Sequence, residues 1–137
     1  MRQLSKTGLA LTAVIILGLL LSGCTGLSFI KKRLPPPQIT EKGVLFQFYS
    51  PSAQIVQVCG NWDTNNWCSG LADTGGFRIG AMEDPDGDGL WELFVKLPAG
   101  RYQYKFIIDE QNWKTDPNNP QRTDDGYGGS NSVLIVD

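Results

Sequence analysis

Residues 90–109 read LWELFVKLPAGRYQYKFIID and indicate the fold class of this chain. Apolar side chains occupy every second position from Trp91 to Leu97, and again from Tyr102 to Phe106. A period of two is the pattern of β-strands that bury one face. The intervening residues 98–100, Pro-Ala-Gly, predict a tight turn, so the two strands are expected to pair as an antiparallel hairpin.

The rest of the domain shows the same strand pattern. Residues 44–49 alternate between two faces, residues 54–59 form a second predicted strand, and residues 132–136 form a closing strand. Clusters of Gly, Asn, Asp and Pro separate these segments, and no helical period is visible. The pattern predicts an all-β chain that folds as an immunoglobulin-like β-sandwich of antiparallel strands.

Several residues have side chains suited to binding a sugar. The loop Gly60–Trp67 ends in an indole, Lys105 lies in the middle of a predicted strand, and Trp113 and Asn131 follow it. Flat rings can cover the apolar faces of a pyranose, while ammonium and amide groups hydrogen-bond its hydroxyls. The alternatives are that Lys105 is a solvated strand lysine and that the indoles pack in the core.

In order and spacing, these residues resemble the glycogen-binding modules of the AMP-activated protein kinase β subunit, branching enzymes and isoamylases (carbohydrate-binding module family 48). The resemblance extends from Gly43 to Val136 and rests on Gly60, Trp62, Asn65-Asn66-Trp67, Leu97-Pro98-Ala99-Gly100, Tyr102-Gln103-Tyr104-Lys105-Phe106, Asp109, Trp113, Asp116-Pro117 and Asn131. It implies an early-set immunoglobulin-like sandwich. It also implies an α-glucan site formed by Trp67, Lys105, Trp113, Tyr127 and Asn131.

The first loop departs from the family pattern. The family has a Gly-x-Phe-Asn-Asn-type loop before its first tryptophan, whereas here Trp62 replaces the phenylalanine and residues 63–64 lengthen the loop. Trp62 and Trp67 are therefore alternatives for the stacking residue. Trp67 is preferred, with Trp62 packed at the base of the loop.

The N-terminal segment predicts export and lipid attachment. Arg2 and Lys6 precede an apolar run, residues 9–21, that is too short for a membrane-spanning helix. Residues 21–24, Leu-Ser-Gly-Cys, resemble the lipobox of bacterial lipoproteins, so residues 1–23 are expected to be a cleaved signal peptide and Cys24 the lipidated residue. We expect a cell-envelope location, at the outer membrane in a Gram-negative host because no aspartate follows Cys24. The alternative is an ordinary signal peptide with a chance cysteine.

Residues 24–40 are predicted to form a tether, and residues 41–137 the β-sandwich domain. The basic triplet at residues 31–33 and the three prolines at residues 35–37 favour an extended segment. Without the leader, ten basic and 14 acidic residues remain, a formal charge of −4. This balance argues against nucleic-acid binding, which requires a basic surface.

Two further features lie in loops. Cys59 and Cys68 bracket the Gly60–Trp67 loop, and in an exported domain they are predicted to form a disulfide. Asp84, Asp86 and Asp88 have the spacing of the first half of a calcium-binding loop, but Val95 stands where the twelfth-position glutamate is needed. The alternative for these aspartates is an acidic turn between two strands.

Catalysis finds little support in the sequence. The chain contains no histidine, no Gly-x-Ser-x-Gly motif and no phosphate-binding loop, and its carboxylates lie in turns such as residues 84–88 and 124–125. We therefore predict a non-catalytic, cofactor-free envelope lipoprotein that binds α-glucan and whose further partner would be a carbohydrate-active enzyme. The alternative is an envelope protein–protein interaction or scaffolding module that uses its indoles at a protein interface.

Overall fold

The computed structural model describes residues 33–69 and 78–137, all within the unit Lys32–Asp137. Its strands are β1 (Gln38–Thr40), β2 (Gly43–Tyr49), β3 (Val56–Gly60), β4 (Leu90–Val95), β5 (Gly100–Ile108), β6 (Asn112–Lys114), β7 (Arg122–Asp124) and β8 (Ser130–Val136). A single-turn element covers Asn66–Cys68. No helix in these two described ranges is long and apolar enough to cross a membrane.

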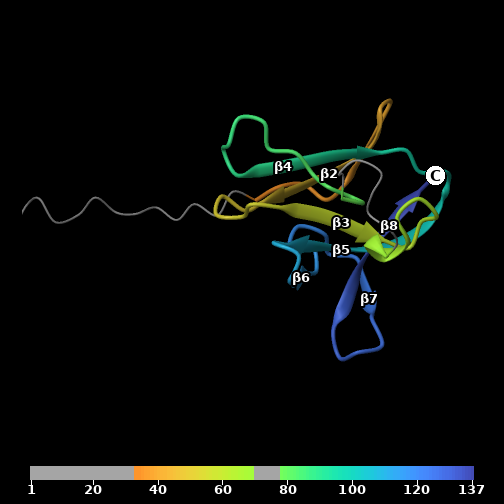
Figure 1. The fold of residues 1–137 in the computed structure, drawn as a ribbon. Coiled ribbons are helices and arrows are strands. Elements are labelled where there is room, and N and C mark those ends of the chain that lie inside the picture. Colours follow the sequence, from red (N-terminus) through yellow and green to blue (C-terminus); the bar gives the residue numbers. More distant parts are fainter. Residues whose placement is uncertain (1–32, 70–77) are drawn as a thin grey trace, which may run out of the picture. The chain divides into compact units, whose positions relative to one another are not determined.

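The strands form two antiparallel sheets that face each other (Figure 1). One sheet has the order β1-β2-β4, and the other has the order β3-β5-β8-β7, with β6 paired to β5. The loop between β7 and β8 extends away from both sheets (Figure 1). The predicted all-β sandwich is therefore confirmed.

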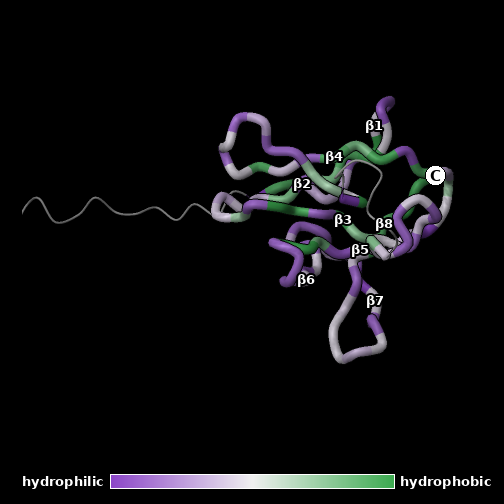
Figure 2. Tube along the Cα trace, in the orientation of Figure 1, coloured by the Kyte–Doolittle hydropathy of each residue, from purple (hydrophilic) through white to green (hydrophobic). Residues whose placement is uncertain are grey.

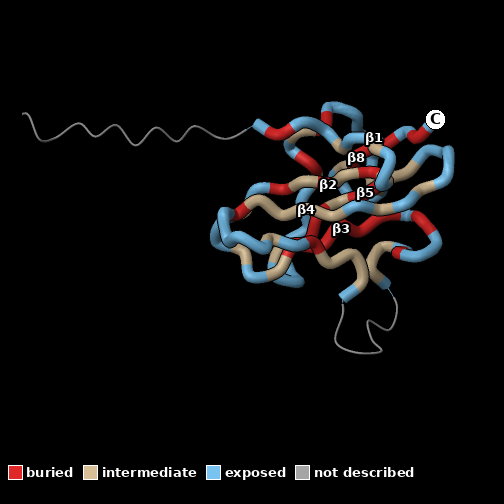
Figure 3. Tube along the Cα trace, turned by 90° about the horizontal axis from the view of Figure 1, so that it is seen from above, coloured by how far each residue is buried: buried red, intermediate tan, exposed pale blue. Residues whose placement is uncertain are grey.

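The core lies between the sheets and is built from the alternating positions of the strands. On β2, Val44, Phe46 and Phe48 are buried while the intervening residues are not, as the period of two predicts. Tyr104 and Phe106 of β5 face them, and the Phe46 and Tyr104 ring centroids lie 5.1 Å apart in an edge-on arrangement. Hydrophobic segments run along the strands (Figure 2), and buried residues follow β2, β3 and β8 (Figure 3).

The predicted hairpin between residues 90–97 and 101–109 is wrong. β4 pairs with β2, and β5 pairs with β3 and β8, so the chain crosses from one sheet to the other between them. Both strands carry an apolar face, as expected, but in a hairpin the two faces would lie side by side in one sheet. In the sandwich they pack against each other across the core, which removes more apolar surface from water.

The folded domain also includes part of the segment predicted to be a tether. β1 (Gln38–Thr40) pairs with β2 and forms one edge of that sheet. Leu34 is buried, with 7% of its surface exposed. The Leu34 amide donates a hydrogen bond to Asn118 Oδ1 at 3.2 Å. Of the predicted tether, residues from Leu34 onward therefore belong to the domain. The predicted signal peptide and Cys24 lie outside the described residues.

A buried polar network joins β5 to the segment between β6 and β7. The Tyr104 hydroxyl donates to Asp116 Oδ2 at 2.7 Å and accepts from Asn119 Nδ2 at 3.0 Å. The Asp116 amide donates to Ser132 Oγ, which ties the same segment to β8. Burial raises the pKa of both Tyr104 and Asp116. Because the folded-state pKa of Asp116 is raised, its protonation favours the fold in acid, and this contribution is lost as the pH rises through that pKa.

We predict that Tyr104→Phe lowers the free energy of unfolding by about 1–3 kcal/mol, because it leaves the buried Asp116 Oδ2 without the hydroxyl that donates to it. Urea denaturation at neutral pH measures the effect. The matched control is Tyr49→Phe, since Tyr49 is 43% exposed on β2. Equal stability of the Tyr104→Phe variant and the parent would contradict this account of the network.

Candidate functional site

Strand β5 brings together segments that are distant in the sequence. One of its edges pairs with β3. Its other edge is divided, because β8 pairs with the first half, from Gly100 to Tyr104, and β6 pairs with Phe106 to Ile108. Lys105 lies at the point where the partner changes. β8 and β6 therefore lie along the same edge of β5, on either side of Lys105. The outer face of this sheet is the face opposite the core.

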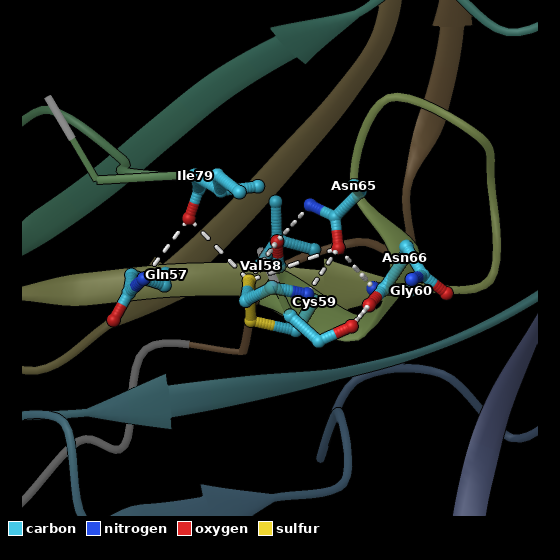
Figure 4. Close-up of a disulfide and its surroundings, with 9 residues drawn as sticks. Gln57, Val58, Cys59, Gly60, Asn65, Asn66 and Ile79 are labelled. Atoms are coloured by element: carbon cyan, nitrogen blue, oxygen red, sulfur yellow. Dashed lines mark hydrogen bonds between the residues drawn. A yellow bond between two sulfur atoms is a disulfide. The ribbon is translucent and has the colours of Figure 1, made fainter. Parts of the chain in front are cut away.

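The register between β3 and β5 places the first loop over the same face. Cys59 lies directly opposite Lys105, and residues opposite each other in an antiparallel pair point to the same face. Cys59 forms a disulfide with Cys68 (Figure 4). The disulfide thereby attaches the Asn66–Cys68 turn, which contains Trp67, to the outer face of the sheet.

This turn has an unusual backbone. Asn66, Trp67 and Cys68 have φ values of 43°, 58° and 56°, in the left-handed region, which costs about 1–2 kcal/mol for each non-glycine residue. The buried Asn65 side chain compensates by accepting hydrogen bonds from the Gly60 and Cys68 amides and donating one to the Val58 carbonyl (Figure 4). Asn65 and the disulfide together hold Trp67 in a conformation that the local backbone disfavours.

A pocket of about 560 Å³ lies over the outer face of β5. It is lined by Trp67, Gln103, Lys105, Trp113, Asp125, Tyr127 and Asn131. Trp113 comes from β6, where it lies opposite Ile107, and is 49% exposed. Tyr127, in the loop between β7 and β8, is 95% exposed. Three aromatic rings therefore border a patch of polar groups.

The polar groups of the pocket are paired with one another. Lys105 Nζ lies 2.6 Å from Asp125 Oδ2, and the two side chains are 17% and 10% exposed. Asn131 Nδ2 donates to Gln103 Oε1 at 2.9 Å. An ammonium group has three protons and each amide has both a donor and an acceptor, so these pairs retain capacity to bond hydroxyl groups.

The electrostatics of the pocket depend on the Lys105–Asp125 pair. The hydrogen bond from Lys105, with further bonds from the Tyr127 and Gly129 amides, lowers the pKa of Asp125 to about 2. Because this pKa is lowered, the contribution of the pair is present at neutral pH and is lost as the pH falls towards that value. The pocket therefore holds one positive and one negative charge that neutralise each other.

Comparison with protein families identifies the domain. The family model described as the glycogen recognition site of AMP-activated protein kinase matches residues 44–137. The chain belongs to this family. The match covers β2 from Val44, all of β3 to β8, and every residue that lines the pocket.

A curated plant protein is similar to part of this chain. Protein PTST homolog 2, chloroplastic, of Arabidopsis thaliana is 45% identical over 49 residues. The aligned part is 36% of this chain and 9% of the relative. The likeness is thus confined to a small part of a much longer protein.

All five residues predicted to bind sugar line the pocket: Trp67, Lys105, Trp113, Tyr127 and Asn131. Of the two loop tryptophans, Trp67 lines the pocket, whereas Trp62 is 6% exposed and stacks on Phe46 in the core. Two lining residues were not predicted. Gln103 shares the outer face of β5 with Lys105, so the strand period could have found it. Asp125 was assigned only to a turn, and no sequence pattern links it to Lys105.

The three aspartates of the predicted calcium loop lie together. Their carboxylate oxygens are within 4.8 Å of one another, and each accepts a hydrogen bond from a backbone amide in the turn that leads into β4. Asp84 Oδ1 is buried without a partner in the part of the chain that the structure describes. Val95 is the last residue of β4. Glu92, which could partly replace the missing glutamate ligand, accepts a hydrogen bond from Gln47. These hydrogen bonds from backbone amides support the acidic turn. Calcium binding stays a prediction.

We predict that Cys59 and Cys68 are joined in protein isolated from an oxidising compartment. The disulfide closes a short loop, so its reduction should lower the free energy of unfolding by about 2–3 kcal/mol. Mass spectrometry after alkylation under denaturing, non-reducing conditions tests the bond, and urea denaturation with and without reductant tests its contribution. A Cys59→Ser/Cys68→Ser variant is the control, because reductant should leave its stability unchanged. Two freely alkylated thiols in the parent would contradict the prediction.

Proposed function

We propose that this domain binds α-glucan chains of the glycogen, starch or malto-oligosaccharide type at the pocket over β5. The observation that carries the proposal is the arrangement of Trp67, Trp113 and Tyr127 around paired polar groups, in a domain of the glycogen recognition family. A ring against each apolar sugar face removes apolar surface from water, and polar groups at the edge give orientation.

The parts of the pocket would act differently. Trp67 and Trp113 come from the disulfide-bound turn and from β6, so they form the more rigid stacking surface. Tyr127 would contact the sugar chain from the exposed loop. Gln103, Lys105 and Asn131 lie on β5 and β8 and would bond the hydroxyl groups. Because most of these side chains are already held in place, little conformational entropy would be lost on binding.

We propose binding without cleavage. Hydrolysis of a glycosidic bond uses two carboxyl groups on opposite sides of the bond. Among the described residues that line the pocket, Asp125 contributes the carboxylate, and it is bound to Lys105. A carbohydrate-active enzyme would then be a partner that receives the bound glucan.

We also propose that the domain is anchored to the cell envelope through a lipid on Cys24. The support comes from sequence alone: the positive residues, the apolar run and the Leu-Ser-Gly-Cys motif at residues 21–24. The anchor would hold the glucan site close to the membrane, on the outer membrane if the host is Gram-negative.

We predict that Trp113→Ala weakens α-glucan binding about tenfold or more, because loss of one stacked ring costs about 1–2 kcal/mol of buried apolar area. The Trp67→Ala/Trp113→Ala variant should lose measurable binding. Calorimetric titration with maltoheptaose, or affinity electrophoresis in glycogen, provides the measurement. Phe94→Ala is the matched control, because Phe94 is similarly exposed at 44% but lies on β4 in the other sheet.

Two results would reject the proposed function. One is no detectable binding of the folded parent to any α-glucan. The other is unchanged affinity in a double tryptophan variant whose melting temperature shows that it is folded.

The anchor is tested separately. Cys24→Ala should leave an unlipidated precursor that keeps residues 1–23, so that metabolic labelling with palmitate is lost and the protein is longer than the processed parent. Cys59→Ser/Cys68→Ser is the matched control, since it removes the other two cysteines without changing Cys24. Processing and fractionation of Cys24→Ala like the parent would contradict lipid anchoring.

A further inference from the structure

The carboxylate of Asp125 is bound on both oxygens, and each oxygen contacts a different part of the pocket. Oδ2 accepts from Lys105 Nζ at 2.6 Å, so it reaches the central strand β5. Oδ1 accepts from the Tyr127 amide at 2.8 Å and from the Gly129 amide at 3.0 Å, both in the loop between β7 and β8. One side chain therefore connects the strand of the pocket to its most exposed loop.

Tyr127 depends on this connection for its position. Tyr127 is 95% exposed, so packing against other side chains does little to fix the position of its ring. The backbone around it turns through Gly126 and Gly128, with φ values of 80° and 85°, and the Asp125 amide closes the turn by donating to the Gly129 carbonyl at 3.2 Å. A loop with two glycines has many conformations available when it is not tied down. Three of the hydrogen bonds within this loop involve Asp125.

Gly129 lies so close to the Asp125 carboxylate that a side chain there would meet it. A Cβ atom added at Gly129 would lie 2.7 Å from Asp125 Oδ2, closer than real Cβ contacts. By contrast, a Cβ at Gly126 or Gly128 would meet nothing within 4 Å. The absence of a side chain at Gly129 thus leaves room for the Asp125 carboxylate between the loop and Lys105.

We propose that Asp125 is a positioning residue of the glucan site, which holds Lys105 and the Tyr127 loop in one binding-competent arrangement. The proposal rests on the proposed function. It adds Asp125, which acts on the bound sugar through Lys105 and Tyr127. A charge-assisted bond between two largely shielded side chains is stronger than a neutral one. The hydrogen bond from Lys105 also lowers the pKa of Asp125.

Three variants separate the two contacts. Asp125→Ala removes both. Asp125→Asn keeps an acceptor for the Tyr127 and Gly129 amides but loses the charge that binds Lys105. Asp124→Asn is the matched control, because it makes the same charge change one residue away, where Asp124 bonds the Gly126 amide and does not line the pocket. Melting temperatures establish that each variant is folded.

Hydrogen exchange of the free protein tests the loop without any sugar. In Asp125→Ala, the Tyr127 and Gly129 amides should exchange about tenfold faster than in the parent, because they lose their acceptor. The change should be smaller in Asp125→Asn and absent at these amides in Asp124→Asn. Unchanged exchange at both amides in folded Asp125→Ala would overturn the proposal, whether or not the parent binds glucan.

Titration with maltoheptaose tests the consequence for binding. Asp125→Ala should weaken affinity about tenfold, Asp125→Asn should also weaken it, and Asp124→Asn should leave it unchanged. Introduced into Tyr127→Ala, the Asp125→Ala change should have a smaller effect, since one of the groups it positions is already gone. An equal effect in both backgrounds, or unchanged affinity in Asp125→Ala, would overturn the proposal. No binding by the parent would instead reject the proposed function, and hydrogen exchange would still decide the positioning of the loop.

Discussion

Strand β5 is hydrogen-bonded along both edges, and the rest of the domain is arranged around it. β3 occupies one edge, while β8 and β6 share the other. Because side chains alternate between faces, the same nine residues supply both the core and the pocket. Tyr104 and Phe106 point inward to β2, and Gln103 and Lys105 point outward to the pocket. A shift of one residue in this register would exchange the two faces and destroy both.

Each face of β5 has one side chain that donates a hydrogen bond to a carboxylate from another segment. Inside, the Tyr104 hydroxyl binds Asp116 and so fixes the segment that follows Trp113. Outside, Lys105 binds Asp125 and so reaches the loop that carries Tyr127. The two carboxylates respond differently to their surroundings: burial raises the pKa of Asp116, and hydrogen bonds from a cation and amides lower that of Asp125. Each attaches a segment between strands to β5.

The first loop reaches the same pocket by another route. Its backbone is left-handed at three successive residues without a glycine, and it is held by one buried amide side chain and one disulfide. The aromatic rings of the pocket therefore come from a turn, a short strand and the loop between β7 and β8, each fixed to β5 or to its neighbour β3 by a different kind of bond. This explains how a small domain can present aromatic rings at fixed positions on an open surface.

The sequence by itself determined the strand pattern, the inward face of each long strand and the residue types of the pocket, because these follow from alternation and from local motifs. It did not determine which strands pair. The predicted hairpin failed because burial of two apolar faces across the sandwich outweighs the local turn signal of residues 98–100. The short strands β1, β6 and β7 carry too few residues to show a period. Lys105 and Asp125 are 20 residues apart in the sequence, and their pairing depends on the register of β8 beside β5. Only the tertiary structure therefore decided it.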